Sequence, residues 1–251
     1  MDGPVVKAAP EAQKRLLDLA ELDLLIHRLM HRRRTLPELA EYEETSARLA
    51  RLATQVIAAE TEAGDLAREQ AKVESDVESV RARAARDQQR LDSGQVSSPR
   101  DLASLQSEIA SLKRRQNDLE EVVLEIMERR EAADAQVRKL TAERDELSAA
   151  LDAIAARRDA ALAEIDRELE EVRDKRGKVA GEIPPDLLGL YEKLREQYEV
   201  GAAMLQHGRC QGCKVVLSIA ELNAIRAAAP DEVVRCEECR RILVRTPESG
   251  L

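Results

Sequence analysis

Aromatic side chains are almost missing from this chain of 251 residues, which has no Trp, no Phe and only three Tyr. A globular core of that size normally buries several large rings. Charged residues make up 35% of the chain, so a compact enzyme with a deep apolar pocket is not expected. The abundance of Ala, Leu, Glu, Lys and Arg is typical of coiled coils, and we expect an elongated, mostly α-helical protein.

Long apolar runs are also missing, since no uncharged stretch approaches the roughly 20 residues that a membrane-spanning helix needs. The first residues contain no apolar segment of signal-peptide length. The formal net charge of -9 argues against uniform binding of nucleic acid. We therefore expect a cytoplasmic protein that makes no contact with a membrane.

Helix-breaking residues are scarce between residues 11 and 183, where the only prolines are Pro37 and Pro99. Turn-forming residues gather at 92–99, so this segment is predicted to reverse the chain. The prediction is a hairpin domain at 1–183, with arms at 11–92 and 101–180 and a turn at 93–100. Pro37 is expected to break or kink the first arm, because it lacks a backbone donor.

Apolar residues recur with the 3-4 spacing of a heptad repeat in both arms, from Tyr42 to Leu91 and from Leu102 to Val172. If the turn centres near Ser98, residues whose numbers sum to about 196 lie opposite each other, and apolar positions then meet in most layers. This pattern predicts a long antiparallel coiled-coil hairpin. Arg130, Arg144 and Arg158 interrupt the seam, and we expect the first two to bury their stems and to send their head groups to its edge.

The hairpin is followed by a predicted connecting helix in the segment 184–204, which holds Tyr191 and Tyr198 on one apolar side. We expect it to pack on residues 16–29 and on the end of the second arm. The remaining segment, 205–251, contains all four cysteines of the chain.

The four cysteines form two C-x2-C pairs, Cys210 with Cys213 and Cys236 with Cys239. Each pair can offer two thiolates from one tight turn, and two pairs complete a tetrahedral shell. The prediction is one structural zinc ion, with iron as the alternative metal. A redox role is less favoured, because a thiol-exchange motif consists of one such pair beside a βαβ unit.

The ribbon around these pairs is predicted to have short strands at 214–217, 232–235 and 240–245. A capping box at Ser218 and Glu221 predicts that a helix begins there and continues through Ala228. The predicted fold class is therefore mostly α, a hairpin with a small C-terminal zinc ribbon of short strands plus one helix.

Three segments carry a family resemblance: Leu190–Arg195, Gly208–Cys213 and Cys236–Leu243. Together with Ser98–Ile109 at the turn, they resemble the bacterial C4-type zinc-ribbon coiled-coil family over nearly the whole chain. Arg240 and Arg241 stand where relatives often carry Gly and then Arg. The resemblance implies a non-enzymatic protein, and some relatives are linked to RNA binding or to a transcription sigma factor.

Basic residues cluster in three places. Residues 81–115 around the turn hold eight basic against four acidic residues, a net of +4, and Arg28, Arg32, Arg33 and Arg34 form a second cluster. For these helical clusters, a solvated or Glu-paired face is the favoured interpretation. The third cluster, a candidate partner-binding or nucleic-acid-binding surface of the ribbon, consists of Arg209, Lys214, Arg235, Arg240, Arg241 and Arg245.

The function expected from these features is a non-enzymatic adaptor in which a coiled-coil arm and a zinc module bind protein or nucleic-acid partners. Components of the transcription machinery are candidate protein partners, and the chain is expected to be a monomer or a weak homodimer. The alternative is an RNA-binding or DNA-binding protein that acts in transcription or post-transcriptional regulation through its basic ribbon and hairpin-tip surfaces. An enzyme is not expected, because no nucleophile–base group, phosphate loop or open metal site is evident.

Overall fold

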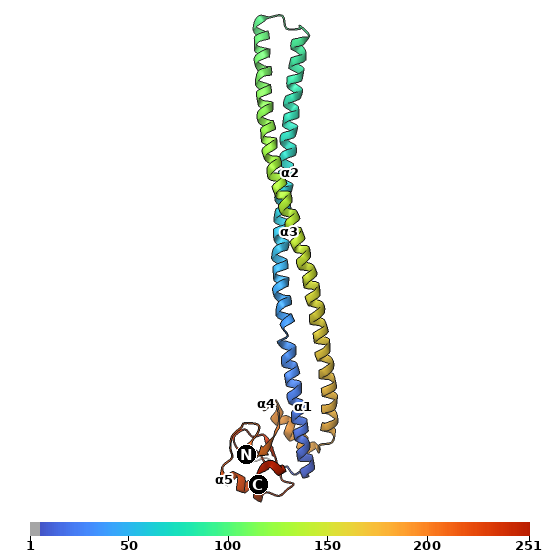
Figure 1. The fold of residues 1–251 in the computed structure, drawn as a ribbon, viewed down its shortest axis with the longest axis vertical. Helices are drawn as coiled ribbons and strands as arrows, with labels where there is room; N and C mark the ends of the chain where they lie inside the picture. Colours follow the sequence, from blue (N-terminus) through green and yellow to red (C-terminus); the bar gives the residue numbers. More distant parts are fainter. Residues whose placement is uncertain (1–5) are drawn as a thin grey trace. The chain divides into compact units, whose positions relative to one another are not determined.

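The computed structural model describes residues 6–251 and is dominated by helices (Figure 1). The chain begins with α1 (Pro10–Arg34), α2 (Pro37–Asp92), α3 (Pro99–Gly181) and α4 (Pro185–Tyr198). The C-terminal part adds β1 (Ala202–Gln206), β2 (Arg209–Cys210), α5 (Ile219–Ala227), β3 (Ile242–Val244) and the 3-10 helix η1 (Pro247–Ser249). The predicted fold class is confirmed: the chain is mostly α, with a long helical hairpin and a small C-terminal sheet.

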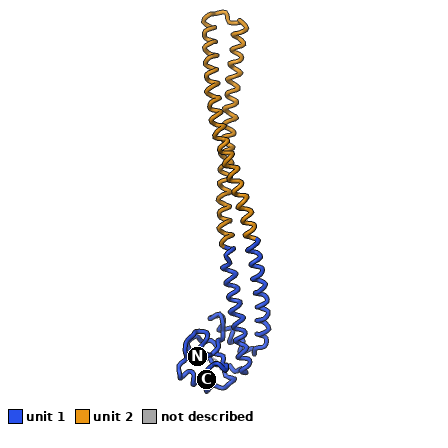
Figure 2. Tube along the Cα trace, in the orientation of Figure 1, with its two compact units in different colours: residues 1–39, 156–251 blue, residues 40–155 orange. Residues whose placement is uncertain are grey.

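The chain divides into two compact units, which Figure 2 shows in different colours. One unit consists of residues 40–155, and the other of residues 1–39 together with 156–251. We call the first the hairpin unit and the second the base unit. None of the helices in the described part of the chain is apolar enough over a sufficient length to cross a membrane.

The hairpin unit is an antiparallel pair formed by α2 and α3, with the chain reversing between Asp92 and Pro99. Leu52, Val56 and Leu66 of α2 are buried, as are Ile109 and Ile126 of α3. These are positions of the heptad stripe, so the predicted seam is confirmed. The chain reverses between α2 and α3 where the turn was predicted. The predicted break is also present, because α1 ends at Arg34 and α2 begins at Pro37.

Polar side chains interrupt the seam as expected. The half-buried Arg130 donates a hydrogen bond from Nη1 to Oε1 of Gln70 at 3.1 Å, and its Nε lies 3.6 Å from Asp134. Arg129 lies 3.9 Å from Glu69 across the hairpin. These pairings lie within about one helical turn of the expected register. Arg144 and Arg158 are half-buried and bond to the neighbouring Asp145 and Asp159.

The base unit has a compact apolar core where α1, α4 and the ribbon meet. Leu16, Leu19, Leu187 and Tyr191 are all completely buried there. The predicted packing of the connecting helix on residues 16–29 is therefore confirmed. That helix ends at Tyr198, however, and the last residues of the segment 184–204 already belong to β1.

A buried polar network joins α1, α4 and the last part of α3 beside this core. The carboxylate of Asp23, 1% exposed, accepts hydrogen bonds from Arg176 Nε at 2.6 Å and from the Tyr191 hydroxyl at 2.7 Å. Glu192 accepts from Arg176 at 2.6 Å and from Arg195 at 2.7 Å. Burial, and then the bond to Asp23, raises the pKa of Tyr191 well above its usual value.

Candidate metal centre and the ribbon surface

The ribbon is built on a three-stranded sheet of order β2-β1-β3, in which β1 is central. β1 is antiparallel to β2 and parallel to β3. Strands were predicted at 214–217, 232–235 and 240–245. Of these segments, only the last contains a strand of the sheet, which is β3. The other two form isolated bridges, Val216 with Arg209 and Arg235 with Ile242, so those two strand predictions were too extensive.

β1 was not predicted, and it is the central strand of the sheet. Its sequence, Ala202–Gln206, contains no β-branched residue and is only five residues long, so its local signal is weak. Its partner β3 follows about forty residues later. Gly201, just before this strand, lies close to the backbone of α4. A Cβ at this position would lie 2.2 Å from the carbonyl oxygen of Tyr191, so a larger residue would not fit. The helix beginning at Ser218 is confirmed, capping box included.

The four cysteines converge on one point. Their Sγ atoms all lie within 4.8 Å of one another, and the Cys210–Cys239 and Cys213–Cys236 separations are both 3.8 Å. Four sulfurs held about 2.3 Å from a zinc ion in a tetrahedron would be about 3.8 Å apart. The spacing therefore fits a single zinc ion, and four ligands leave no position open for a substrate.

The two pairs sit in matching turns. In the first, the N–H of Lys214 donates to the carbonyl of Cys210 at 2.8 Å; in the second, the N–H of Arg240 donates to that of Cys236 at 2.9 Å. Lys214 and Arg240 both have a left-handed backbone, with φ of 65° and 62°. A glycine would adopt this conformation more readily than either residue does.

Backbone donors surround the sulfurs. The N–H groups of Gly212 and Cys213 point to the sulfur of Cys210, and those of Glu238 and Cys239 point to the sulfur of Cys236. Burial nevertheless raises the pKa of the Cys210 thiol to about 12. The thiolate at this position therefore depends on a nearby positive charge, which Zn²⁺ supplies when bound.

The six basic residues of the ribbon do not form a single patch. Arg209 lies on β2, whereas Arg235 bridges Ile242 of β3, so the central strand β1 separates them. Arg235 donates from Nε to the carbonyl of Arg240 at 2.9 Å. Lys214 and Arg240 are exposed, each at the end of its own cysteine turn.

Arg241 and Arg245 bind the protein's own backbone. Arg241 donates to the carbonyls of Tyr198 at 2.9 Å and Val200 at 3.2 Å, and its guanidinium lies 5.0 Å from the centre of the Tyr198 ring. Arg245 contacts five carbonyls around the end of α5, including Glu232 at 2.7 Å. These two guanidinium groups thus stabilise the ribbon. Their role depends on contacts between residues far apart in the sequence, so it could not be predicted from the sequence.

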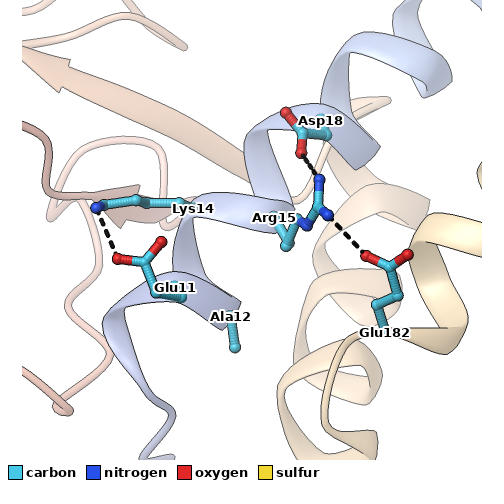
Figure 3. Close-up of a pocket in the computed structure, with 6 residues that line it drawn as sticks. All are labelled: Glu11, Ala12, Lys14, Arg15, Asp18 and Glu182. Carbon is cyan, nitrogen blue, oxygen red and sulfur yellow. Dashed lines mark hydrogen bonds and ion pairs between the residues drawn. The ribbon is translucent and has the colours of Figure 1, made fainter.

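A shallow polar hollow of about 500 Å³ lies in the base unit beside α1 (Figure 3). Its charged groups pair with one another: Lys14 lies 2.9 Å from Glu11, and Arg15 lies 2.9 Å from Asp18 and 3.0 Å from Glu182. Both basic side chains of this hollow are therefore already engaged by carboxylates of the chain itself.

The fold and the cysteine site define a helical-hairpin protein with a C4 zinc ribbon. Residues 19–199 match the model of the CT398-like coiled coil hairpin domain, and residues 209–243 match that of the C4-type zinc ribbon domain. The chain belongs to the CT398-like hairpin family and carries a structural zinc site.

Relatives with this arrangement occur in several bacteria. An uncharacterised protein of Mycobacterium tuberculosis, Rv2229c, is 40% identical over 240 residues, covering 96% of this chain and 98% of its own. A solved Mycobacterium smegmatis structure is 36% identical with a TM-score of 0.85, covering 96% of this chain and all of that one. CT398 from Chlamydia trachomatis is 20% identical with a TM-score of 0.69, covering 93% and 97%, and it supports the fold alone.

Proposed function

We propose that the chain is a non-enzymatic cytoplasmic adaptor, in which the zinc ribbon and the hairpin each bind a partner. The observation that carries the proposal is the ribbon surface: its metal shell is closed by four sulfurs, while Val216 and Ile219 beside it are 59% and 79% exposed. Exposed apolar side chains next to a rigid module are typical of protein-binding surfaces. In the hairpin unit, Leu124 is an exposed apolar side chain as well.

The proposal predicts that both units touch a partner at once. Cross-linking of the full-length, zinc-loaded protein through its lysines, in the cells that produce it, tests this. Lys214 of the ribbon and Lys113 near the hairpin turn are both exposed, so we expect mass spectrometry to find cross-links from each to a partner protein. Cross-links confined to the chain itself would contradict an adaptor role. Metal-dependent turnover of a substrate by the purified protein would contradict a non-enzymatic function.

A second candidate function is RNA or DNA binding, favoured by the charge near the hairpin turn. Arg86, Arg90, Arg100, Arg114 and Arg115 are all exposed there, although Arg81 and Arg83 pair with Glu78 and Glu108. Phosphate contacts would make binding fall steeply with salt. Titrating labelled RNA and DNA across a salt series tests this, and binding that is absent at low salt or insensitive to salt would exclude it.

A further inference from the structure

The sheet of the ribbon has an incomplete outer edge at residues 214–217. Cys210 N–H donates to the carbonyl of Val215 at 3.0 Å, and Leu217 N–H donates to that of Gly208 at 2.9 Å. In an antiparallel ladder, the residue between two such bonds turns its own N–H and C=O outward. That residue is Val216, and within residues 6–251 it makes no backbone hydrogen bond. One donor and one acceptor are therefore available beyond the edge.

The side chains at this edge are apolar and exposed. Val215 is 42% exposed, Val216 59% and Ile219 79%, and all three are β-branched. We call these three residues, with the flanking Arg209 and Lys214, the ribbon edge. Proteins that stay monomeric commonly cover such edges or blunt them with charge. Here Arg209 and Lys214 flank the edge, but Val216 is left 59% exposed, which leaves the edge open to a further strand.

The charge around the edge selects the kind of partner. Between residues 200 and 220 the chain contains Arg209 and Lys214 but no Asp or Glu. The next acid along the chain, Glu221, is engaged in the capping box, where it accepts the Ser218 N–H at 2.7 Å. The zinc–thiolate group is itself anionic, but the Cys210 sulfur is buried and faces backbone donors. The outward charge at the edge is positive, which favours acidic residues in a partner.

We propose that the ribbon edge binds an extended segment of a partner protein, which pairs with the backbone of Val216 as an additional strand. Successive side chains of that segment point to opposite faces of the sheet, as Val215 and Val216 do, so they contact these residues and Ile219 from both faces. Its acidic residues lie near Arg209 and Lys214. Backbone pairing gives such complexes affinity, while the side chains give specificity. The inference rests on the adaptor function proposed above and specifies its surface and partner chemistry.

Random twelve-residue peptides displayed on phage, selected against the full-length zinc-loaded protein, provide the probe. We expect the enriched peptides to be rich in β-branched and acidic residues and to bind with dissociation constants on the order of micromolar, since the edge is small. Fluorescence anisotropy with the labelled peptides then measures affinity for each variant. Zinc content and the tyrosine near-ultraviolet spectrum show that each variant is folded.

Two variants separate the parts of the proposal. Val216→Pro keeps an apolar side chain but removes the outward N–H, and Ile219→Lys removes the most exposed apolar side chain. Each should weaken binding roughly tenfold or more, as expected for central interface contacts. Ile57→Lys is the matched control, because Ile57 is 63% exposed but lies on α2. It should change binding less than about twofold, as surface substitutions outside an interface do.

Several results would overturn the proposal. Failure to enrich any peptide, or enriched peptides that bind both edge variants as tightly as the original chain, would exclude the edge. Dimerisation of the protein that Val216→Pro abolishes would show that a second copy occupies it, and competition by RNA would show a nucleic-acid surface. A partner protein cross-linked in cells but retained by both variants would leave the adaptor function standing and reject this surface alone.

Discussion

The hairpin unit and the base unit are stabilised in different ways. In the hairpin unit, buried residues such as Val56, Leu66 and Ile126 form successive small layers separated by polar positions such as Gln70 and Arg130. In the base unit, a few completely buried groups hold several elements at once, and the cysteine site joins two distant turns. The first kind of structure spreads its stability along the sequence, whereas the second concentrates it at a few sites.

Metal removal should give the largest difference between the two units. Cys236→Ser removes one thiolate, and structural zinc binding is coupled to folding by roughly 10–16 kcal/mol. We expect zinc bound per chain to fall from one to almost none, with the ribbon unfolded and the helical signal at 222 nm largely retained. Elemental analysis and circular dichroism measure both. A variant that keeps its zinc would show that the ligand set is wrong.

Breaking the Asp23 network should affect only the base unit. Asp23→Asn removes one of the two carboxylate partners of the partly buried Arg176 and leaves Glu192 as the other, so we expect a cost of about 3 kcal/mol, the low end for a broken buried pair. Chemical denaturation followed by tyrosine fluorescence reports on the base unit in a Tyr42→Phe background, because Tyr191 and Tyr198 then remain as the tyrosines and the chain has no Trp. Lys14→Asn, an exposed site on the same helix, is the control. Equal effects of the two changes would show that the network contributes little.

A single layer of the hairpin seam should matter less. Ile126 is 2% exposed, whereas Leu124 on the same helix is 60% exposed. Ile126→Ala should lower the free energy of unfolding by about 2 kcal/mol, at the low end for buried truncations. Leu124→Ala should change it by less than about 0.5 kcal/mol, as is usual at the surface. The helical signal during denaturation measures both, and similar values would refute the assigned seam.

The two units should also differ at high pH. Folding raises the pKa of Tyr191, so unfolded chains lose that proton first as the pH rises. The stability contributed by the neutral phenol is complete below about pH 10 and falls above it, by up to about 1.4 kcal/mol per pH unit. Tyr191→Phe should abolish this slope in denaturation curves of the base unit. An unchanged slope in that variant would assign the effect to another group.

The smallest predicted effect comes from a backbone conformation. Arg240 has φ of 62°, which costs a side-chain-bearing residue about 1 kcal/mol relative to glycine. Arg240→Gly should therefore stabilise the ribbon by roughly 0.5–1 kcal/mol, since part of the gain is lost to a more flexible unfolded chain. Melting of the zinc-loaded protein, followed by the absorbance of Tyr198, whose ring the ribbon residue Arg241 contacts, would show it. A lower melting temperature would mean that the Arg240 side chain contributes a stabilising contact.

Much of the fold was predictable because its signals are local or periodic. The heptad stripe predicted the hairpin and its seam, Pro37 predicted the break, and two C-x2-C pairs predicted the metal site. The positions of the few aromatic residues were also informative, since Tyr191 marks the compact core of the base unit and is completely buried there. One further signal was available: Asp23 is an acid on the face of α1 that also carries Leu16 and Ala20, and a buried acid requires a partner.

The remainder depended on contacts between distant residues. β1 pairs with a strand about forty residues later, and its own sequence gives a weak strand signal. Arg241 and Arg245 look like any exposed arginine in the sequence, but their donors are used by backbone carbonyls. The sequence showed that the ribbon has six basic residues but not where their side chains lie. In the structure, two of them bind backbone carbonyls of the chain itself, and the others lie at separate edges of the sheet.

Hydrogen exchange with and without a strong zinc chelator tests the contrast between the units most directly. We predict that chelation removes protection from residues 202–244, around the cysteine turns and the sheet, because the metal and the ribbon fold together. Protection across residues 40–155 should stay unchanged, since the hairpin seam contains no ligand of the metal. Loss of protection throughout the hairpin, or a ribbon that stays protected after its zinc is removed, would contradict this account.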